Sequence, residues 1–420
     1  MASKLKRHRL LLRDKVLKHL PESLKGPLYR KMIKIDLDPL PGLELRVART
    51  EHELSSAFRL LHDNYVRSGF MNPHPSGMRI TKYHALSSTT TLIACIGDQV
   101  VGTVSIVRNG AFGVPLDAVF DVSPFLKKGV RIAEVSSLAV HPEHSGKRGQ
   151  ILFPLLNFLY HYCEYYFGVD YLVIAVNPTW WDFYRHVLLF EKLEDRIVTE
   201  YSFVNGAPAV GGILNLKTAR ERYSAMYNHR AANQNLFEYL GNKTIAGVEY
   251  PTRGYGKVSD PVMTPDLLRH FFVEQSDALS KLSEHEKVEL WNLYSHRDFR
   301  KHLPRPLTPV AKLDGRGKNL RHDIDGEVRV HTNQVSITGR IKNASHCGML
   351  LIANRGLRQG ESIELEIPIS ESEIIRVTAN VVWSDVQGAS GLRIAENHNR
   401  WGDLIRSLEN ELLHERKPAA

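Results

Sequence analysis

The chain has 420 residues, 43% of them hydrophobic and 24% charged, which allows two or three domains with their own cores and excludes disorder over most of the chain. Its three cysteines (Cys95, Cys163 and Cys347) lie far apart without CxxC spacing, which excludes a disulfide framework and a zinc ribbon and indicates a reducing compartment. The net charge of +9 lies wholly in residues 1–34, so a nucleic-acid polymer is not an expected partner.

The N-terminal arm, residues 1–43, mixes eleven Lys or Arg with leucines and valines, which predicts a basic amphipathic helix. Such a helix can lie on anionic lipid, where each basic side chain contributes on the order of 1 kcal/mol. A solvated arm and a helix docked on its own protein are the alternatives. No run of residues approaches 18 apolar positions and no signal peptide is recognisable, so we expect a cytoplasmic protein in which any membrane contact is peripheral, at the inner face.

The segment after the arm, residues 44–220, has the pattern of an α/β domain with a mixed sheet. Helical spacing of apolar residues predicts a helix over 53–66, and two apolar runs around Gly97-Asp98 predict a β-hairpin. Next come a predicted central strand, a long apolar helix, a second strand, a short helix and closing strands, over 130–140, 151–167, 171–176, 180–187 and 190–216.

The remaining residues fall into two units of different texture. Residues 221–312 are predicted to form a mostly helical extension of the first domain or a spacer, with helices over 267–272 and 279–294 and no chemical motif. Residues 313–414 alternate short strands with turns, which predicts a small antiparallel β-barrel closed by a helix over 401–413.

Two stretches of the first domain resemble motifs of the GNAT acyltransferase superfamily. Residues 133–142 read A-E-V-S-S-L-A-V-H-P, similar to that superfamily's E-x-S-x-L-A-V-x-P strand. Val176-Asn177-Pro178, followed by Phe183-Tyr184-Arg185, is similar to its N-P-x-x-x-F-Y turn. The resemblance covers residues 47–216 and implies a GNAT-like fold that transfers an acyl group to an amine.

The loop after the first motif bears on the acyl donor. Acetyl-CoA users carry R/Q-x-x-G-x-G/A there, whose N–H groups hold the pyrophosphate, whereas residues 144–150 read H-S-G-K-R-G-Q. This departure favours the branch that resembles long-chain N-acyl amino acid synthases and acyl-homoserine-lactone synthases, which take the acyl group from acyl carrier protein. Lactone synthases have an arginine where this chain has Ser137, which argues against a lactone product.

The chemistry assigns two catalytic side chains. Glu134, expected to be half-buried on the central strand, is the candidate general base that takes a proton from the attacking ammonium, for which burial must raise its pKa from about 4.3. The resemblance implies that Tyr184 protonates the leaving thiolate. The alternatives are a structural Glu134 paired with Arg131, and a Tyr184 that only packs in the core.

Further residues are expected around this pair. Acyl-donor binding is expected at the end of the central strand, where backbone N–H groups align the donor, and in the loops beyond it: Leu138, Val140, Lys147, Arg148 and Asn177. The two basic residues of this set form a landing patch for the acidic carrier protein or are ordinary solvated charges. The substrate pocket is expected to include Arg59, Tyr65 and Ser136.

Two other features of the first domain bear on what it binds. Large apolar side chains along residues 153–166 line a channel for a long acyl chain, in which each buried CH₂ contributes about 0.8 kcal/mol, or they pack the core. His141 and His144 lack further residues at metal-ligand spacing. We therefore expect no metal and no cofactor beyond the carrier-bound donor.

The predicted barrel carries a motif of its own. Asn343-Ala-Ser345-His-Cys-Gly348 matches the [D/N]-x-S-x-x-G signature of PilZ domains, a resemblance that implies binding of cyclic di-guanylate. The family's other motif is R-x-x-x-R, and here Arg321 takes the second position while Gly317 takes the first. With Arg316 and Lys318 as substitutes for the missing arginine, the expected ligand set is Arg316, Lys318, Arg321, Asn343, Ser345 and Gly348.

The sequence thus predicts an enzyme that transfers a long-chain acyl group from acyl carrier protein to the amine of an amino acid, with its activity or location modulated by cyclic di-guanylate. Two alternatives stay open: a non-catalytic effector that binds cyclic di-guanylate, and an N-acetyltransferase that uses acetyl-CoA. The sequence names neither the amine nor the length of the acyl chain.

Overall fold

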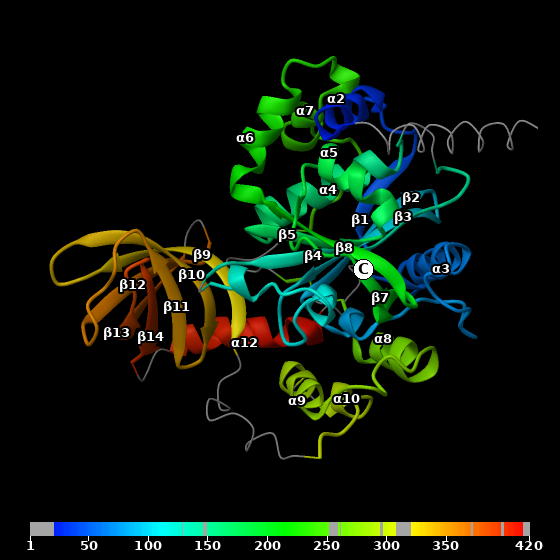
Figure 1. The fold of residues 1–420 in the computed structure, drawn as a ribbon. Helices are drawn as coiled ribbons and strands as arrows, with labels where there is room; N and C mark the ends of the chain where they lie inside the picture. The colour runs from blue at the N-terminus through cyan, green and yellow to red at the C-terminus, as the bar shows by residue number, and fades with distance from the viewer. Residues whose placement is uncertain are drawn as a thin grey trace, which may run out of the picture.

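The computed structural model describes residues 21–127, 129–145, 149–251, 259–260, 262–294, 297–307, 321–370, 373–395 and 399–414. The first domain is built on an eight-stranded mixed sheet of order β1-β2-β3-β4-β5-β8-β6, with β7 paired to β8 (Figure 1). Its strands are β1 (Leu43–Val47), β2 (Thr89–Ile96), β3 (Gln99–Arg108), β4 (Ile132–Val140), β5 (Tyr171–Val176), β6 (Glu191–Lys192), β7 (Val198–Tyr201) and β8 (Ala207–Asn215). The predicted hairpin and both predicted central strands are confirmed.

Helices cover both faces of this sheet, which is why β2 and β3 are buried along nearly their whole lengths. On one face lies α3 (Glu51–Arg67), which begins at a capping box between Thr50 and Glu53. On the other lies α4 (Leu152–His161), which continues as a π-helical turn over Tyr162–Tyr166. After β5 come a 3₁₀ turn (Pro178–Trp180) and α5 (Trp181–His186).

The helical residues after β8 pack against the first domain on both sides rather than forming a separate spacer (Figure 1). Near α4 lie α6 (Leu216–Tyr227) and α7 (Leu236–Gly241), and near α3 lie α8 (Pro265–Arg269), α9 (Glu284–Leu293) and α10 (Arg297–Arg300). One predicted boundary was wrong: the helix expected from residue 279 begins at Glu284, because Ser283 caps it together with Glu286.

The described part of the N-terminal arm is docked on its own protein. Helix α2 (Glu22–Met32) packs beside α5, where the Arg30 guanidinium donates to the carbonyl of His186 at 3.0 Å. Ile33 and Ile35, just after α2, are buried in the core of the first domain. Residues 1–20 lie outside the described residues. Among the helices that the structure describes, none has the length and apolar character needed to cross a bilayer.

The C-terminal residues form the predicted barrel, a closed antiparallel sheet of order β10-β11-β14-β13-β12-β9. Its strands are β9 (His322–His331), β10 (Ser336–Ser345), β11 (Gly348–Ala353), β12 (Ser362–Pro368), β13 (Ile374–Ser384) and β14 (Ala389–Ile394). Apolar and exposed residues alternate along these strands, so one side of each fills the interior. Helix α12 (Asn399–His414) docks on the barrel through the buried side chains of Trp401 and Ile405.

Candidate active site

The divergence of β4 from β5 opens the sheet beside the predicted catalytic strand. The two strands run parallel and pair only at Ile132, Ala133 and Glu134, whereas β4 pairs with β3 as far as Val140. Within that stretch Ser137 has a φ of +56° and the β3–β4 register shifts, which marks a bulge. The peptide groups of β4 beyond Glu134 therefore have no β5 partner, as acyl-donor binding requires.

The Glu134 side chain lies at the point of divergence and is only 3% exposed. The prediction of half-burial was wrong, because the 3₁₀ turn Pro115–Ala118 covers the carboxylate and the Leu116 N–H donates to it at 2.7 Å. Burial raises the pKa of Glu134 to about 8; the Leu116 hydrogen bond opposes this rise and the nearby Asp117 adds to it. Such a carboxyl group is a far better proton acceptor near neutral pH than an ordinary glutamate.

The structure does not contain the alternative expected for Glu134, an ion pair with Arg131. Arg131 does not pair with Glu134, since its guanidinium binds Asp325 of the barrel. The groups near Glu134 are instead phenols: burial and then the Glu134 charge raise the pKa values of Tyr83 and Tyr201. The Tyr201 hydroxyl is buried and has no hydrogen-bond partner among the described residues. Glu134 thus lies near buried tyrosines, one of which has an unpaired hydroxyl among the described residues.

Tyr184, the candidate acid, lies on α5 and contacts two aromatic rings edge-on, Phe183 at 5.6 Å and Phe190 at 6.0 Å between ring centroids. Burial, with a smaller contribution from Tyr65, raises the pKa of Tyr184 to about 12. The phenol therefore keeps its proton at neutral pH, as a proton donor to a thiolate must. Tyr65 is half-buried at the end of α3 and lies under the guanidinium of Arg79.

Those of the predicted donor-binding residues that the structure describes lie beyond the point where β4 and β5 separate. Leu138 and Val140 are half-buried near the end of β4. Asn177 follows β5 and caps the turn before α5, because its Oδ1 accepts from the Thr179 N–H at 3.1 Å. Lys147 and Arg148 lie outside the described residues.

The structure also bears on two other expectations for the first domain, the substrate pocket and the apolar stripe of α4. Arg59 is exposed on the outer side of α3, so the structure does not bring it into the pocket, whereas Ser136 is half-buried on β4. The apolar stripe along α4 packs the core: Phe153, Phe158 and Tyr162 are all buried in the main hydrophobic cluster. A lining of an acyl channel is therefore not the role of this stripe.

Several residues of the pocket were missed at the sequence level. They come from three different segments: Arg79 from a loop, Tyr83 from a 3₁₀ turn and Tyr201 from β7. What they share is their proximity in the folded chain. Tyr201 lies in the closing segment of the resemblance, but nothing in its neighbours predicts an unpaired hydroxyl. Arg79 has no acidic neighbour in the sequence, which is a weak sign of a buried, unpaired cation.

A surface cavity of about 570 Å³ lies next to the turn that covers Glu134. Asp117 and Ala118 line it, together with residues 119–123, Leu126, Arg196 and Val198. The turn is held in place because Asp117 accepts from the Val114 N–H at 2.8 Å, and Gly113, with a φ of +65°, leaves room for that carboxylate. The Pro115–Ala118 turn therefore separates the buried carboxylate from the surface.

The predicted nucleotide site of the barrel is partly assembled. Arg321, just before β9, donates to the Asn343 side-chain oxygen at 2.6 Å. Ser345 is buried and ends β10, and two residues separate it from β11. Gly348 was predicted to allow a tight turn. The structure gives a different reason for a glycine at this position, because a Cβ there would lie 2.6 Å from the Leu392 carbonyl oxygen of β14. Arg316 and Lys318 lie outside the described residues.

Comparison with known proteins assigns both parts of the chain. Residues 56–215 match the family model of the N-acyl amino acid synthase FeeM, and residues 316–409 match that of the PilZ domain. The chain joins a FeeM-type acyltransferase domain to a PilZ domain. No curated protein matches the chain. In the described part of the chain, no group of three His, Cys, Asp or Glu side chains could hold a metal ion.

Solved structures similar to the FeeM-type domain include FeeM, an N-acyl amino acid synthase from uncultured soil microbes, at 25% identity over 43% of this chain and 93% of that chain, with a TM-score of 0.37. BjaI, a CoA-dependent acyl-homoserine lactone synthase, is 17% identical over 50% of this chain and 96% of that chain, with a TM-score of 0.36. The PilZ domain is similar to that of CeSA from a cellulose-synthesizing bacterium, at 14% identity over 23% of this chain and 99% of that chain, with a TM-score of 0.19.

Proposed function

We propose that the FeeM-type domain transfers a long-chain acyl group from acyl carrier protein to the amine of an amino acid. The observation that carries this proposal is the buried Glu134, with its raised pKa, where β4 and β5 separate. A thioester laid along the unpaired edge of β4 would place its carbonyl near this carboxylate. The match of residues 56–215 to the N-acyl amino acid synthase family supports the choice of an amino acid as acceptor.

The reaction follows from these groups. Glu134 accepts one proton from the substrate ammonium, and the free amine attacks the thioester carbonyl. Backbone N–H groups of β4 near Leu138 and Val140 donate to the oxyanion that forms. When the C–S bond breaks, the Tyr184 hydroxyl donates its proton to the departing sulfur and regains one from the nitrogen, which becomes an amide. The products are an N-acyl amino acid and the thiol of the carrier.

Two loops of the first domain support acyl carrier protein as the donor. The segment between β4 and α4 lacks the glycine spacing that holds a CoA pyrophosphate. The exposed Lys127 in the loop before β4, with the basic residues 147 and 148, supplies positive charge that would attract an acidic carrier protein. Purified enzyme offered acyl carrier protein or CoA carrying the same chain should turn over the carrier-bound donor faster; equal or faster use of acyl-CoA would reject this donor.

The test of the enzymatic proposal is mass spectrometry of lipid extracts from cells that express the wild type, Glu134→Gln or Glu221→Gln. Glu221 is an exposed residue of α6 and serves as the matched control. Acylated amino acids should accumulate with the wild type and the control and fall at least about 100-fold with Glu134→Gln. Undiminished product from Glu134→Gln would remove the proposed base.

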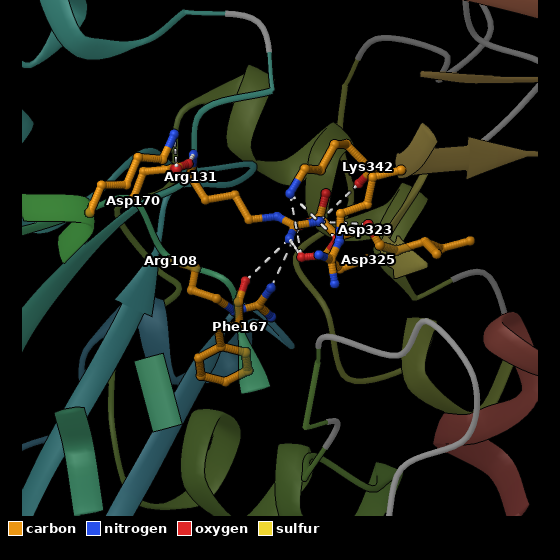
Figure 2. A network of polar contacts seen from close by, with 10 residues as sticks. Arg108, Arg131, Phe167, Asp170, Asp323, Asp325 and Lys342 are labelled. Carbon is orange, nitrogen blue, oxygen red and sulfur yellow. Dashed lines mark hydrogen bonds and ion pairs between the residues drawn. The ribbon is translucent and has the colours of Figure 1, made fainter. Parts of the chain in front are cut away.

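We further propose that cyclic di-guanylate bound to the PilZ domain modulates the transfer through the contact between the domains. Figure 2 shows this contact, a network of charged groups beside the end of β3 and the start of β4. Arg131, which precedes β4, forms an ion pair with Asp325 of β9 and donates to the carbonyls of Ile324 at 2.5 Å and Lys342 at 3.3 Å. Arg108 is the last residue of β3, and its Nη1 lies 3.7 Å from Oδ2 of Asp323.

The network is electrostatically favourable and closely packed. Burial by itself would raise the pKa of Asp325, but Arg131, Lys342 and Arg340 outweigh it and hold the pKa below its ordinary value. Gly168, with a φ of +56°, faces the same carboxylate, and a Cβ there would lie 2.6 Å from Asp325 Oδ2. The barrel could not approach this closely if residue 168 carried a side chain.

The position of the network supports its role in regulation. On the barrel side, Asp323 pairs across the strands with Asn343 and lies two residues from Arg321, both expected ligands of the nucleotide. On the enzyme side, Arg131 lies three residues before Glu134, and Arg108 pairs with Ala133. A nucleotide that moves Arg321 or Asn343 would therefore act on strands that hold the ion pairs, and through these on β4.

A further inference from the structure

Arg79 is a buried cation in the FeeM-type domain that the mechanism above does not use. Its side chain is 7% exposed, and Nη2 donates to the Phe203 carbonyl at 2.7 Å. The guanidinium carbon lies 4.3 Å from the centre of the Tyr65 ring and 4.9 Å from that of Phe203. In the part of the chain that the structure describes, no carboxylate forms an ion pair with Arg79, and its Nε has no hydrogen-bond partner.

Arg79 and Glu134 lie near the same aromatic side chains. The charges of both act on the hydroxyls of Tyr65 and Tyr201. Phe203, whose carbonyl holds Arg79, stacks on Tyr201 with ring centroids 5.7 Å apart and meets Tyr83 edge-on at 6.3 Å. The Glu134 charge in turn contributes to the raised pKa values of Tyr83 and Tyr201. A buried cation and a buried base thus face a shared group of aromatic side chains, with the unpaired Tyr201 hydroxyl among them.

An amino acid carries its ammonium and its carboxylate on the same carbon atom, so it presents two opposite charges a short distance apart. We propose that Arg79 binds the α-carboxylate of the amino acid whose ammonium Glu134 deprotonates, and that the Tyr201 hydroxyl donates a second hydrogen bond to it. This inference rests on the proposed function and specifies its acceptor: an amine that bears an adjacent carboxylate. The free Nε and the planar guanidinium suit a carboxylate, which prefers such donors.

The consequence is selectivity against amines without a carboxylate. An acceptor that lacks this group leaves the Arg79 charge and the Tyr201 hydroxyl buried without partners, and sites of this kind reject such analogues strongly. Glu134 alone cannot supply this discrimination, since it acts only on the nitrogen. Arg79 is in this sense a specificity-determining residue for the proposed reaction.

The test compares amino acids with the matched decarboxylated amines, leucine with isoamylamine, phenylalanine with phenethylamine, and tyrosine with tyramine, as acceptors for the wild type, Arg79→Met, Arg79→Lys and Arg67→Met. The exposed Arg67, at the end of α3, gives the control. The wild type and the control should prefer the amino acid by about 100-fold or more in kcat/KM. Arg79→Met should lose most of that preference, chiefly by a raised KM for the amino acid, and Arg79→Lys should retain part of it.

A preference that survives in Arg79→Met, or its absence in the wild type, overturns the inference while leaving acyl transfer to an amine intact. Circular dichroism and thermal melting establish that the variants fold. If the wild type acylates no amine, the proposed function fails, and the same amino acids are then tested for binding by the shift of Tm. Stabilisation of the wild type and Arg67→Met that Arg79→Met loses supports the carboxylate site, and equal shifts in all three reject it.

Discussion

At the scale of single residues, burial determines what the titratable groups of the site can do. Glu134 and Tyr184 are both shifted upward in pKa by burial, one to about 8 and the other to about 12. The separation leaves one group able to accept a proton and the other able to donate one over the same range of pH. A candidate base and a candidate acid are thus obtained from ordinary side chains.

The raised pKa of Glu134 predicts how activity depends on pH. Transfer needs the ionised carboxylate, so kcat/KM should rise as pH increases towards about 8 and level off above it. Glu134→Gln should lower kcat/KM by about 10²–10⁴-fold and abolish this limb. Rates measured between pH 5.5 and 9.5 with a saturating donor check both points; a wild-type limb that persists in Glu134→Gln would contradict the assignment.

The same shift predicts a stability effect of opposite sign. A carboxyl whose pKa is higher in the folded than in the unfolded protein favours folding when protonated, so its contribution is full below about pH 4.5 and is lost as pH rises through about 8. The wild type should therefore lose stability relative to Glu134→Gln between pH 5 and pH 9. Urea unfolding of both proteins at the two values of pH measures this difference; a constant difference would mean that Glu134 is not shifted.

At the scale of elements, the bulge in β4 shapes the site. Ser137 is buried and has a φ of +56°, a region that β-branched residues rarely adopt. We expect Ser137→Val to destabilise the protein by about 1–3 kcal/mol and Ser137→Gly to be tolerated. Chemical denaturation of the two variants checks this expectation. Equal stability of Val and Gly at position 137 would show that the bulge does not constrain the residue.

The barrel offers a second test at this scale. A Cβ at residue 348 would lie 2.6 Å from the Leu392 carbonyl, so Gly348→Ala should push β11 from β14 and destabilise the PilZ domain. Gly402 of α12 meets only the flexible end of Arg406, and there alanine should stabilise by about 1 kcal/mol. Thermal melts of the two variants should therefore shift in opposite directions.

Elements were more predictable than the contacts between them. The strands of both domains follow from apolar runs and alternation, and Glu134 became a candidate because residues 133–142 resemble the GNAT strand motif. Full burial of that side chain was not predictable, since it depends on a turn 18 residues earlier in the chain. Arg79 was missed for the same reason: the aromatic rings that enclose it come from positions 65 and 203, which meet only after the chain folds.

At the scale of the whole molecule, the ion pairs of Arg131 and Arg108 join two domains whose interacting residues are about 200 positions apart (Figure 2). No local pattern in the sequence predicts such a pairing. The proposed regulation depends on it, because the nucleotide site and the base lie on opposite sides of the contact. Removing one partner of such a partly buried ion pair leaves the other charge without compensation, which destabilises the contact.

We therefore expect Asp325→Asn to uncouple the domains. Acylation should become insensitive to cyclic di-guanylate, whereas nucleotide binding measured by calorimetry should persist; Arg321→Ala should instead lose binding and response together. Asp298→Asn, at an exposed carboxylate of α10, provides the control. A full response in Asp325→Asn would show that the signal travels elsewhere, and the absence of any response in the wild type would remove the proposed regulation.

The Pro115–Ala118 turn has a consequence for the ionisation of Glu134. Its Leu116 N–H is the donor that stabilises the ionised form of Glu134, and Asp117 and Ala118 of the same turn line the outer cavity. A displacement of the turn would withdraw this donor and raise the pKa of Glu134 further. The carboxylate would then bind a proton more tightly but would be ionised in a smaller fraction of molecules near neutral pH, so the position of the turn sets the balance between the two.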